Sequence, residues 1–156
     1  MIPYGKQSIN DDDVAAVVEA LKSDFLTCGP KVDEFEKAFA EFVGAKHAVA
    51  VCNATAALHL AMLVAEIGKG DRVITSANTF LSSANCAAFV GATPDFCDID
   101  QQTHLMCADA LENMWTSDIK AVISVAYAGQ SADMPRIAEI AREHGAVIIE
   151  DACHGT

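Results

Sequence analysis

The sequence predicts an α/β fold with three layers, α/β/α, in which helices cover both faces of a mainly parallel β-sheet. Two observations lead to this prediction. Short apolar segments with strand character alternate along the chain with longer segments in which apolar residues recur at helical spacing. The strand segments are also apolar along most of their length, which is typical of parallel strands that are buried on both faces.

Residues 1–45 are predicted to form a helical segment that precedes the sheet. An amphipathic pattern over residues 10–23 begins with Asn10 and three aspartates, and negative charge stabilises a helix N-terminus. After a Thr-Cys-Gly-Pro break, a second helix is expected over residues 32–43, where valine and phenylalanine form one stripe. Gly44 should end this helix.

Residues 46–156 are predicted to form the α/β domain. Its strands are expected where apolar runs are bounded by turn residues, at 48–52, 72–75, 93–99, 120–126 and 146–150. Its helices are expected where the spacing is helical, at 55–67, 80–90, 108–115 and 135–144. Only six residues follow the last strand, so we expect the chain to be interrupted within its domain.

Composition and charge exclude several classes of protein. The 156 residues are 52% hydrophobic and 21% charged, as in a packed globular protein. The net charge of −12 argues against nucleic-acid binding, which requires basic side chains at the phosphates. The apolar runs are too short to cross a membrane and no signal-peptide pattern is visible, so we expect a cytoplasmic protein. The six cysteines form no Cys-x-x-Cys pair, so no metal site is predicted.

Candidate ligand-binding residues follow the predicted strands, because ligands of open α/β sheets bind at the carboxyl ends of the strands. Ala54 and Thr55 begin a helix there, where free N–H groups bind phosphate unless the helix start is a plain N-cap. Phe80 follows the next strand, as a stacking surface or as core. Asp151 ends a buried run and needs a partner, either a ligand cation or a helix that it caps. His154 comes three residues later.

Motifs of the common nucleotide-binding and hydrolytic folds are absent. The sequence contains no Gly-x-Gly-x-x-Gly, no Gly-x-x-x-x-Gly-Lys-Ser/Thr and no Gly-x-Ser-x-Gly. The glycine-rich residues 68–71 precede a strand instead of following one, and we interpret them as a turn.

Several segments in order carry a more specific signal. They are Thr-Cys-Gly-Pro-Lys at 27–31, Asn-Ala-Thr-Ala-Ala-Leu-His-Leu-Ala at 53–61, Gly-Lys-Gly-Asp-Arg-Val-Ile at 68–74, Thr-Phe with Ala-Asn at 79–85, Tyr-Ala-Gly-Gln at 127–130 and Glu-Asp-Ala-Cys-His at 150–154. Together they resemble the DegT/DnrJ/EryC family of fold-type I aminotransferases, which use pyridoxal 5′-phosphate (PLP). The resemblance covers nearly the whole chain.

The resemblance implies a PLP site and gives each candidate residue a role in it. Asp151 matches the carboxylate that keeps the ring nitrogen of PLP protonated. Phe80 matches the residue that stacks on the ring, and Ala54 and Thr55 match the phosphate site. His154 falls close to the phenolic oxygen of the cofactor.

The resemblance also implies a reaction, an amino transfer from an amino acid, glutamate, to a nucleotide-linked keto-sugar in a homodimer. The family's Schiff-base lysine lies beyond the aspartate motif, whereas every lysine of this sequence precedes Asp151. We therefore expect the N-terminal part of such an enzyme, without transaminase activity of its own. A non-catalytic truncated assembly module is one alternative, and another fold-type I enzyme, a cysteine desulfurase or aldolase, is the other.

Overall fold

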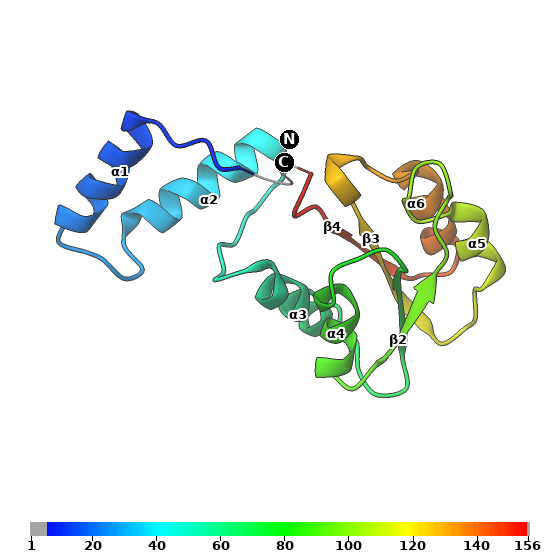
Figure 1. Cartoon of the computed structure of the whole chain (residues 1–156). Helices are drawn as coiled ribbons and strands as arrows, with labels where there is room; N and C mark the ends of the chain where they lie inside the picture. Colours follow the sequence, from blue (N-terminus) through cyan, green and yellow to red (C-terminus); the bar gives the residue numbers. More distant parts are fainter. Residues whose placement is uncertain (1–5, 156) are drawn as a thin grey trace. The chain divides into compact units, whose positions relative to one another are not determined.

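The structure is a computed structural model that describes residues 6–155. The chain divides into two compact units, Met1–Ala50 and Val51–Thr156 (Figure 1). None of the helices in the described part of the chain is both long and apolar enough to span a membrane.

The first unit contains the two helices predicted from the sequence, α1 (Asp11–Lys22) and α2 (Pro30–Val43). The Asn10 side chain caps the start of α1, and the Asp13 carboxylate accepts a hydrogen bond from the Asn10 backbone N–H in return. At the end of α2, Gly44 has a φ of 69°, a left-handed conformation that glycine adopts without strain. Local capping chemistry therefore sets both ends of this helical pair.

The second unit is built on a parallel sheet of four strands, ordered β2-β1-β3-β4. In chain order, the strands are β1 (Arg72–Ser76), β2 (Thr93–Cys97), β3 (Ile119–Val125) and β4 (Val147–Asp151). The prediction of an α/β fold with a parallel sheet is confirmed.

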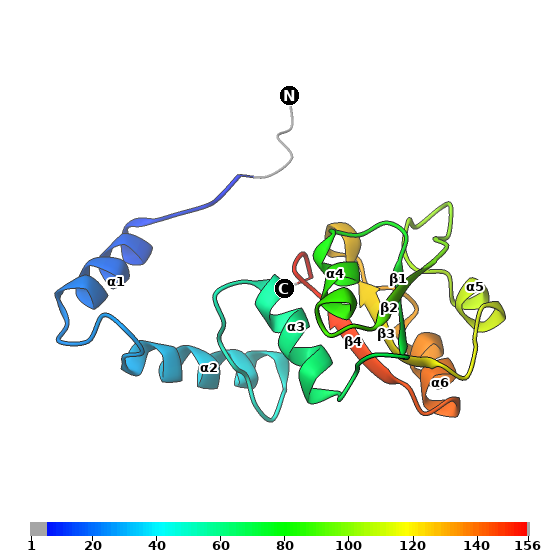
Figure 2. The same cartoon turned by 90° about the horizontal axis from the view of Figure 1, so that it is seen from below.

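Two helices cover each face of the sheet, as Figure 2 shows. They are α3 (Ala54–Val64) and α4 (Ser82–Phe89) on one face, and α5 (Ala108–Asn113) and α6 (Met134–Glu143) on the other. In β3, Ala121 and Ile123 pack in a buried cluster with α3 and α4, while Val122 packs in the cluster with α5 and α6. Because β3 packs against an apolar cluster on each face, it is buried along most of its length and has no polar face.

One predicted strand, residues 48–52, is wrong. These residues form no helix or strand, and the Val49 side chain is 77% exposed. The Ala50 N–H donates to the Glu36 carboxylate at 2.7 Å instead of to a neighbouring strand. A strand requires backbone partners as well as an apolar composition, and the four-stranded sheet described above does not pair with this segment. The other predicted helices and strands are confirmed to within a few residues at each end.

Candidate functional site

The strand order marks the carboxyl edge of the sheet as the place for a ligand. The chain leaves β1 towards β2 on one side, whereas it leaves β3 towards β4 on the other side. Connections that diverge between neighbouring strands leave a crevice at the carboxyl edge, where ligands of open α/β sheets bind. The predicted site residues belong to segments that begin or end at this edge.

Asp151 is the last residue of β4 and is only 8% exposed. Its Oδ2 accepts a hydrogen bond from the Ser83 hydroxyl at 2.8 Å, while its Oδ1 lies 3.4 Å from the backbone nitrogen of Cys153. Within residues 6–155, no lysine, arginine or histidine forms an ion pair with Asp151. A buried carboxylate is stable only with compensating partners, so this position suits a cationic ligand group.

The start of α3 is capped in part. The Asn53 side chain accepts from the Ala56 N–H at 2.9 Å, so the N-cap considered for this position exists. This cap satisfies only the N–H group of Ala56. Within residues 6–155, the N–H groups of Ala54 and Thr55 have no acceptor. The Thr55 hydroxyl lies 2.7 Å from the Ser82 hydroxyl. Two free N–H groups at a helix start suit an anion such as phosphate.

The first turn of α4 brings these two parts of the site together. Its neighbouring residues Ser82 and Ser83 contact Thr55 and Asp151 respectively, although Thr55 and Asp151 are far apart in the sequence. Phe80, just before α4, is 72% exposed and so is not a core residue. The structure thus gathers Thr55, Phe80 and Asp151 around one helix start.

His154 lies in the turn after β4, beside the loop that follows β3. Its Nδ1 accepts a hydrogen bond from the Ala128 N–H at 3.3 Å, and its ring centroid is 6.3 Å from that of Tyr127. Because Nδ1 accepts this hydrogen bond, the proton of the neutral imidazole lies on Nε2, which has no hydrogen-bond partner within residues 6–155. The described residues show no hydrogen bond between His154 and Asp151.

Cys153 was not among the residues selected from the sequence. A hydrogen bond to the Asp151 carboxylate, together with burial and the charge of Asp151, raises the pKa of the Cys153 thiol to about 11. The thiol therefore stays protonated at neutral pH and is a poor nucleophile.

Sequence reasoning also missed the hydroxyl groups around the start of α4. Thr79 donates to Ser83 at 2.7 Å, and Ser82 and Ser83 are both buried. The available signal was two adjacent serines at the start of a helix of mostly small apolar residues, because buried hydroxyls need hydrogen-bond partners inside the protein. Those partners are contributed by distant segments, so the sequence alone could not identify them.

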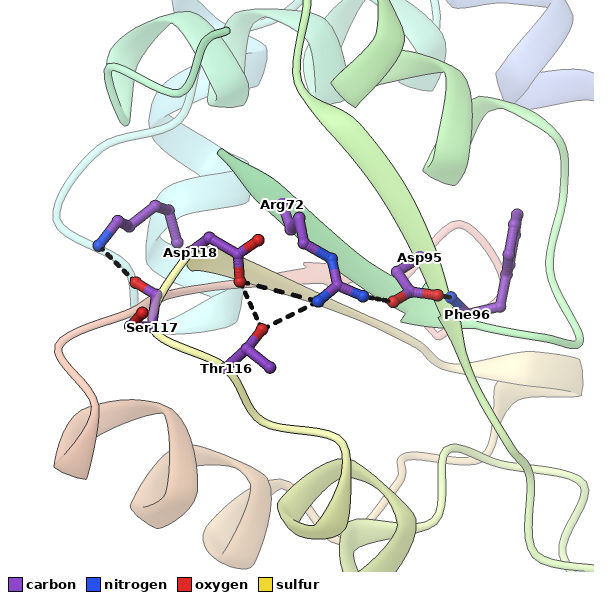
Figure 3. A network of polar contacts seen from close by, with 7 residues as sticks. Arg72, Asp95, Phe96, Thr116, Ser117 and Asp118 are labelled. Carbon is purple, nitrogen blue, oxygen red and sulfur yellow. Dashed lines mark hydrogen bonds and ion pairs between the residues drawn. The ribbon is translucent and has the colours of Figure 1, made fainter. Parts of the chain in front are cut away.

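The opposite, amino edge of the sheet holds a different polar network (Figure 3). Arg72, the first residue of β1, forms an ion pair with Asp95 of β2 and hydrogen-bonds to the Thr116 hydroxyl at 2.9 Å. Its guanidinium also lies 3.7 Å from the Asp118 carboxylate, which accepts from Thr116. The arginine thereby ties β1 to β2 and to the loop that precedes β3.

A three-layer α/β unit with a buried carboxylate and free helix N–H groups at its carboxyl edge has the features of a cofactor-binding domain. Residues 7–156 match the DegT/DnrJ/EryC1/StrS aminotransferase family, and the chain belongs to this family.

Individual relatives agree with this assignment. The chain is 49% identical over 153 residues to the spore coat polysaccharide biosynthesis protein SpsC of Bacillus subtilis (strain 168), covering 98% of the chain and 39% of SpsC. An aminotransferase from Psychrobacter cryohalolentis matches with a TM-score of 0.92 and 32% identity, over 99% of the chain and 40% of that protein. NtdA from Bacillus subtilis, solved with bound pyridoxamine 5′-phosphate (PMP), has a TM-score of 0.87 and 30% identity, over 94% of the chain and 35% of NtdA. The chain thus spans well under half the length of these relatives.

Proposed function

We propose that this chain is the cofactor-binding N-terminal part of a PLP-dependent sugar aminotransferase. Residues 46–156 would form part of the PLP-binding large domain, and residues 1–45 the helical segment before it. The observation that carries this proposal is the buried Asp151 carboxylate, which has hydroxyl and N–H donors but no counter-ion within residues 6–155. A protonated pyridine ring supplies such a charge.

The residues at the carboxyl edge fit the parts of PLP. Asp151 would hold the ring nitrogen, and the exposed side chain of Phe80 would cover one face of the ring. The N–H groups of Ala54 and Thr55 would bind the phosphate at the N-terminus of α3. His154 would donate from Nε2 to the phenolic oxygen, because its Nδ1 is already occupied.

When bound, PLP supplies the electron sink that makes amino transfer possible. The residues of this chain would position that group and set its charge. Asp151 would hold a proton at the ring nitrogen, because a buried carboxylate stabilises a neighbouring positive charge. The helix start would fix the phosphate end, and Phe80 would exclude water from one side of the ring.

We further propose that the complete protein transfers the amino group of an amino acid, glutamate, to a nucleotide-linked keto-sugar. Membership of an aminotransferase family favours this reaction over a cysteine desulfurase or an aldolase. The relation to SpsC, which is named for polysaccharide biosynthesis, favours a sugar as the acceptor.

This proposal is tested with the full-length protein that contains residues 1–156. Purified protein is incubated with PLP, glutamate and a set of nucleotide-linked keto-sugars, and products are identified by mass spectrometry. The expected products are an amino sugar and 2-oxoglutarate in equal amounts. Release of sulfur from cysteine, or aldol cleavage without amino transfer, would overturn the proposal in favour of the other fold-type I activities.

We also propose that the protein works as a homodimer. Support comes from α1, which buries none of its residues and exposes Val14, Val17 and Leu21, and from β4, which is an edge strand of the described sheet. Light scattering of the full-length protein should give the mass of a dimer. A monomer at high protein concentration would contradict this part of the proposal.

A further inference from the structure

We propose that Thr79 and Ser83 are positioning residues that orient the Asp151 carboxylate for the ring nitrogen of the cofactor. This inference rests on the proposed function, because it concerns the same site. It adds to that function two hydroxyl groups that have no direct contact with the cofactor and act through Asp151.

The geometry is a chain of two hydrogen bonds. Thr79 Oγ1 lies 2.7 Å from Ser83 Oγ, and Ser83 Oγ lies 2.8 Å from Asp151 Oδ2. Ser83 is completely buried, so water does not compete for its hydroxyl. Both distances are typical of hydrogen bonds between oxygen atoms.

The direction of the chain follows from the chemistry of the groups. An ionised carboxylate is only an acceptor, so Ser83 must donate its single proton to Asp151. Ser83 then accepts from Thr79, and a hydroxyl that accepts one hydrogen bond donates a stronger one. The relay therefore runs from Thr79 through Ser83 to Asp151 and stabilises negative charge on Oδ2.

This arrangement selects the oxygen that meets the cofactor. Oδ2 is held by Ser83, whereas the backbone contact of Oδ1 with the Cys153 nitrogen is long, at 3.4 Å. We infer that Oδ1 binds the ring nitrogen and that Ser83 prevents the carboxylate from rotating away.

The test compares variants that remove or keep one hydroxyl. Ser83→Ala and Thr79→Val break the relay, while Thr79→Ser keeps it. Thr75→Val is the matched control for Thr79→Val, because it also removes one threonine hydroxyl of this unit, which is buried and donates to the Ile123 carbonyl and not to the chain of hydroxyls that ends at Asp151. Circular dichroism and thermal melting establish that each variant is folded.

The readout is the affinity of the full-length protein for two probes. One is PMP, and the other is a PMP analogue in which CH replaces the ring nitrogen. The ratio of the two dissociation constants measures only the interaction at the ring nitrogen, because a general structural defect weakens both probes equally. The wild-type protein should bind PMP more tightly than the analogue.

The preference for PMP should fall about tenfold in Ser83→Ala, as expected for the loss of a hydrogen bond to a charged group. It should fall about threefold in Thr79→Val, which removes only the hydrogen bond from Thr79 to Ser83. The preference should be unchanged in Thr79→Ser and Thr75→Val. An unchanged preference in Ser83→Ala, even with weaker binding of both probes, would overturn the inference and leave the proposed function intact. A wild-type protein that binds neither probe would overturn the proposed function, and this inference with it.

Discussion

The two edges of the parallel sheet satisfy their charged groups in different ways. At the amino edge, Arg72 meets two carboxylates and a hydroxyl from two neighbouring segments, β2 and the loop that precedes β3. At the carboxyl edge, the more deeply buried Asp151 has hydroxyl and N–H donors but no counter-ion among the described residues. A complete network serves the fold, whereas an incomplete one prepares a place for a ligand. The comparison therefore predicts that substitutions at the two edges change different properties.

The largest effect is expected for Asp151→Asn in the full-length protein. Asparagine still accepts from Ser83, so the free energy of unfolding should change by less than about 1 kcal/mol. Affinity for PMP should fall on the order of 100-fold, because the charge-assisted hydrogen bond to the ring nitrogen is lost. Fluorescence titration and urea unfolding measure the two quantities. A large loss of stability with unchanged affinity would assign Asp151 to the fold.

Arg72→Met should show the opposite pattern. The apolar stem of the side chain is kept, but Asp95 and Asp118 lose their shared cation at the edge of the sheet. The free energy of unfolding should fall by about 2 kcal/mol, a value between those of exposed and buried ion pairs. Affinity for PMP should stay within a factor of about two. A strong loss of PMP binding in a folded protein would show that the edges are not independent.

A smaller effect is expected at the helix start. Thr55→Val removes the hydroxyl that contacts Ser82 but leaves the backbone N–H groups of α3 in place. Affinity for PMP should fall about fivefold, because the start of α3 loses the neutral hydrogen bond to Ser82 that helps to hold its N–H groups in position. Thr55→Ser, which keeps the hydroxyl, is the control and should bind normally. Inorganic phosphate should compete with PMP in the wild-type protein, and absence of competition would contradict a phosphate site here.

The smallest effect concerns Cys153 at alkaline pH. The folded state raises the pKa of this thiol from 9.0 to about 11, so its contribution to stability is present below pH 9.0 and is lost as the pH rises through about 11. Burial also raises the pKa values of Cys86 and Cys97, so the free energy of unfolding should still fall at alkaline pH in any Cys153 variant. The free energy of unfolding, measured with urea for wild type and Cys153→Ala across this pH range, should fall less steeply in the variant. Parallel curves would show that Asp151 does not hold the thiol proton.

The sequence predicted the fold better than the contacts of the site. Apolar strands and capped helices follow local rules, so the parallel sheet and its four covering helices were predictable. The error at residues 48–52 arose because an apolar run does not specify its neighbour. Asp151 and Thr55 were selected from the sequence because one ends a predicted strand and the other begins a predicted helix. Thr79, Ser82 and Ser83 were missed because their role depends on contacts between distant segments.

The most direct test of the central claim is a crystal structure of the full-length protein with PMP. The ring nitrogen should lie within hydrogen-bond distance of Asp151 Oδ1, and the phosphate should accept from the N–H groups of Ala54 and Thr55. The Ser83 hydroxyl should still contact Asp151 Oδ2, as it does at 2.8 Å in this structure. PMP bound elsewhere, with Asp151 and the start of α3 remote from its ring nitrogen and phosphate, would contradict the account.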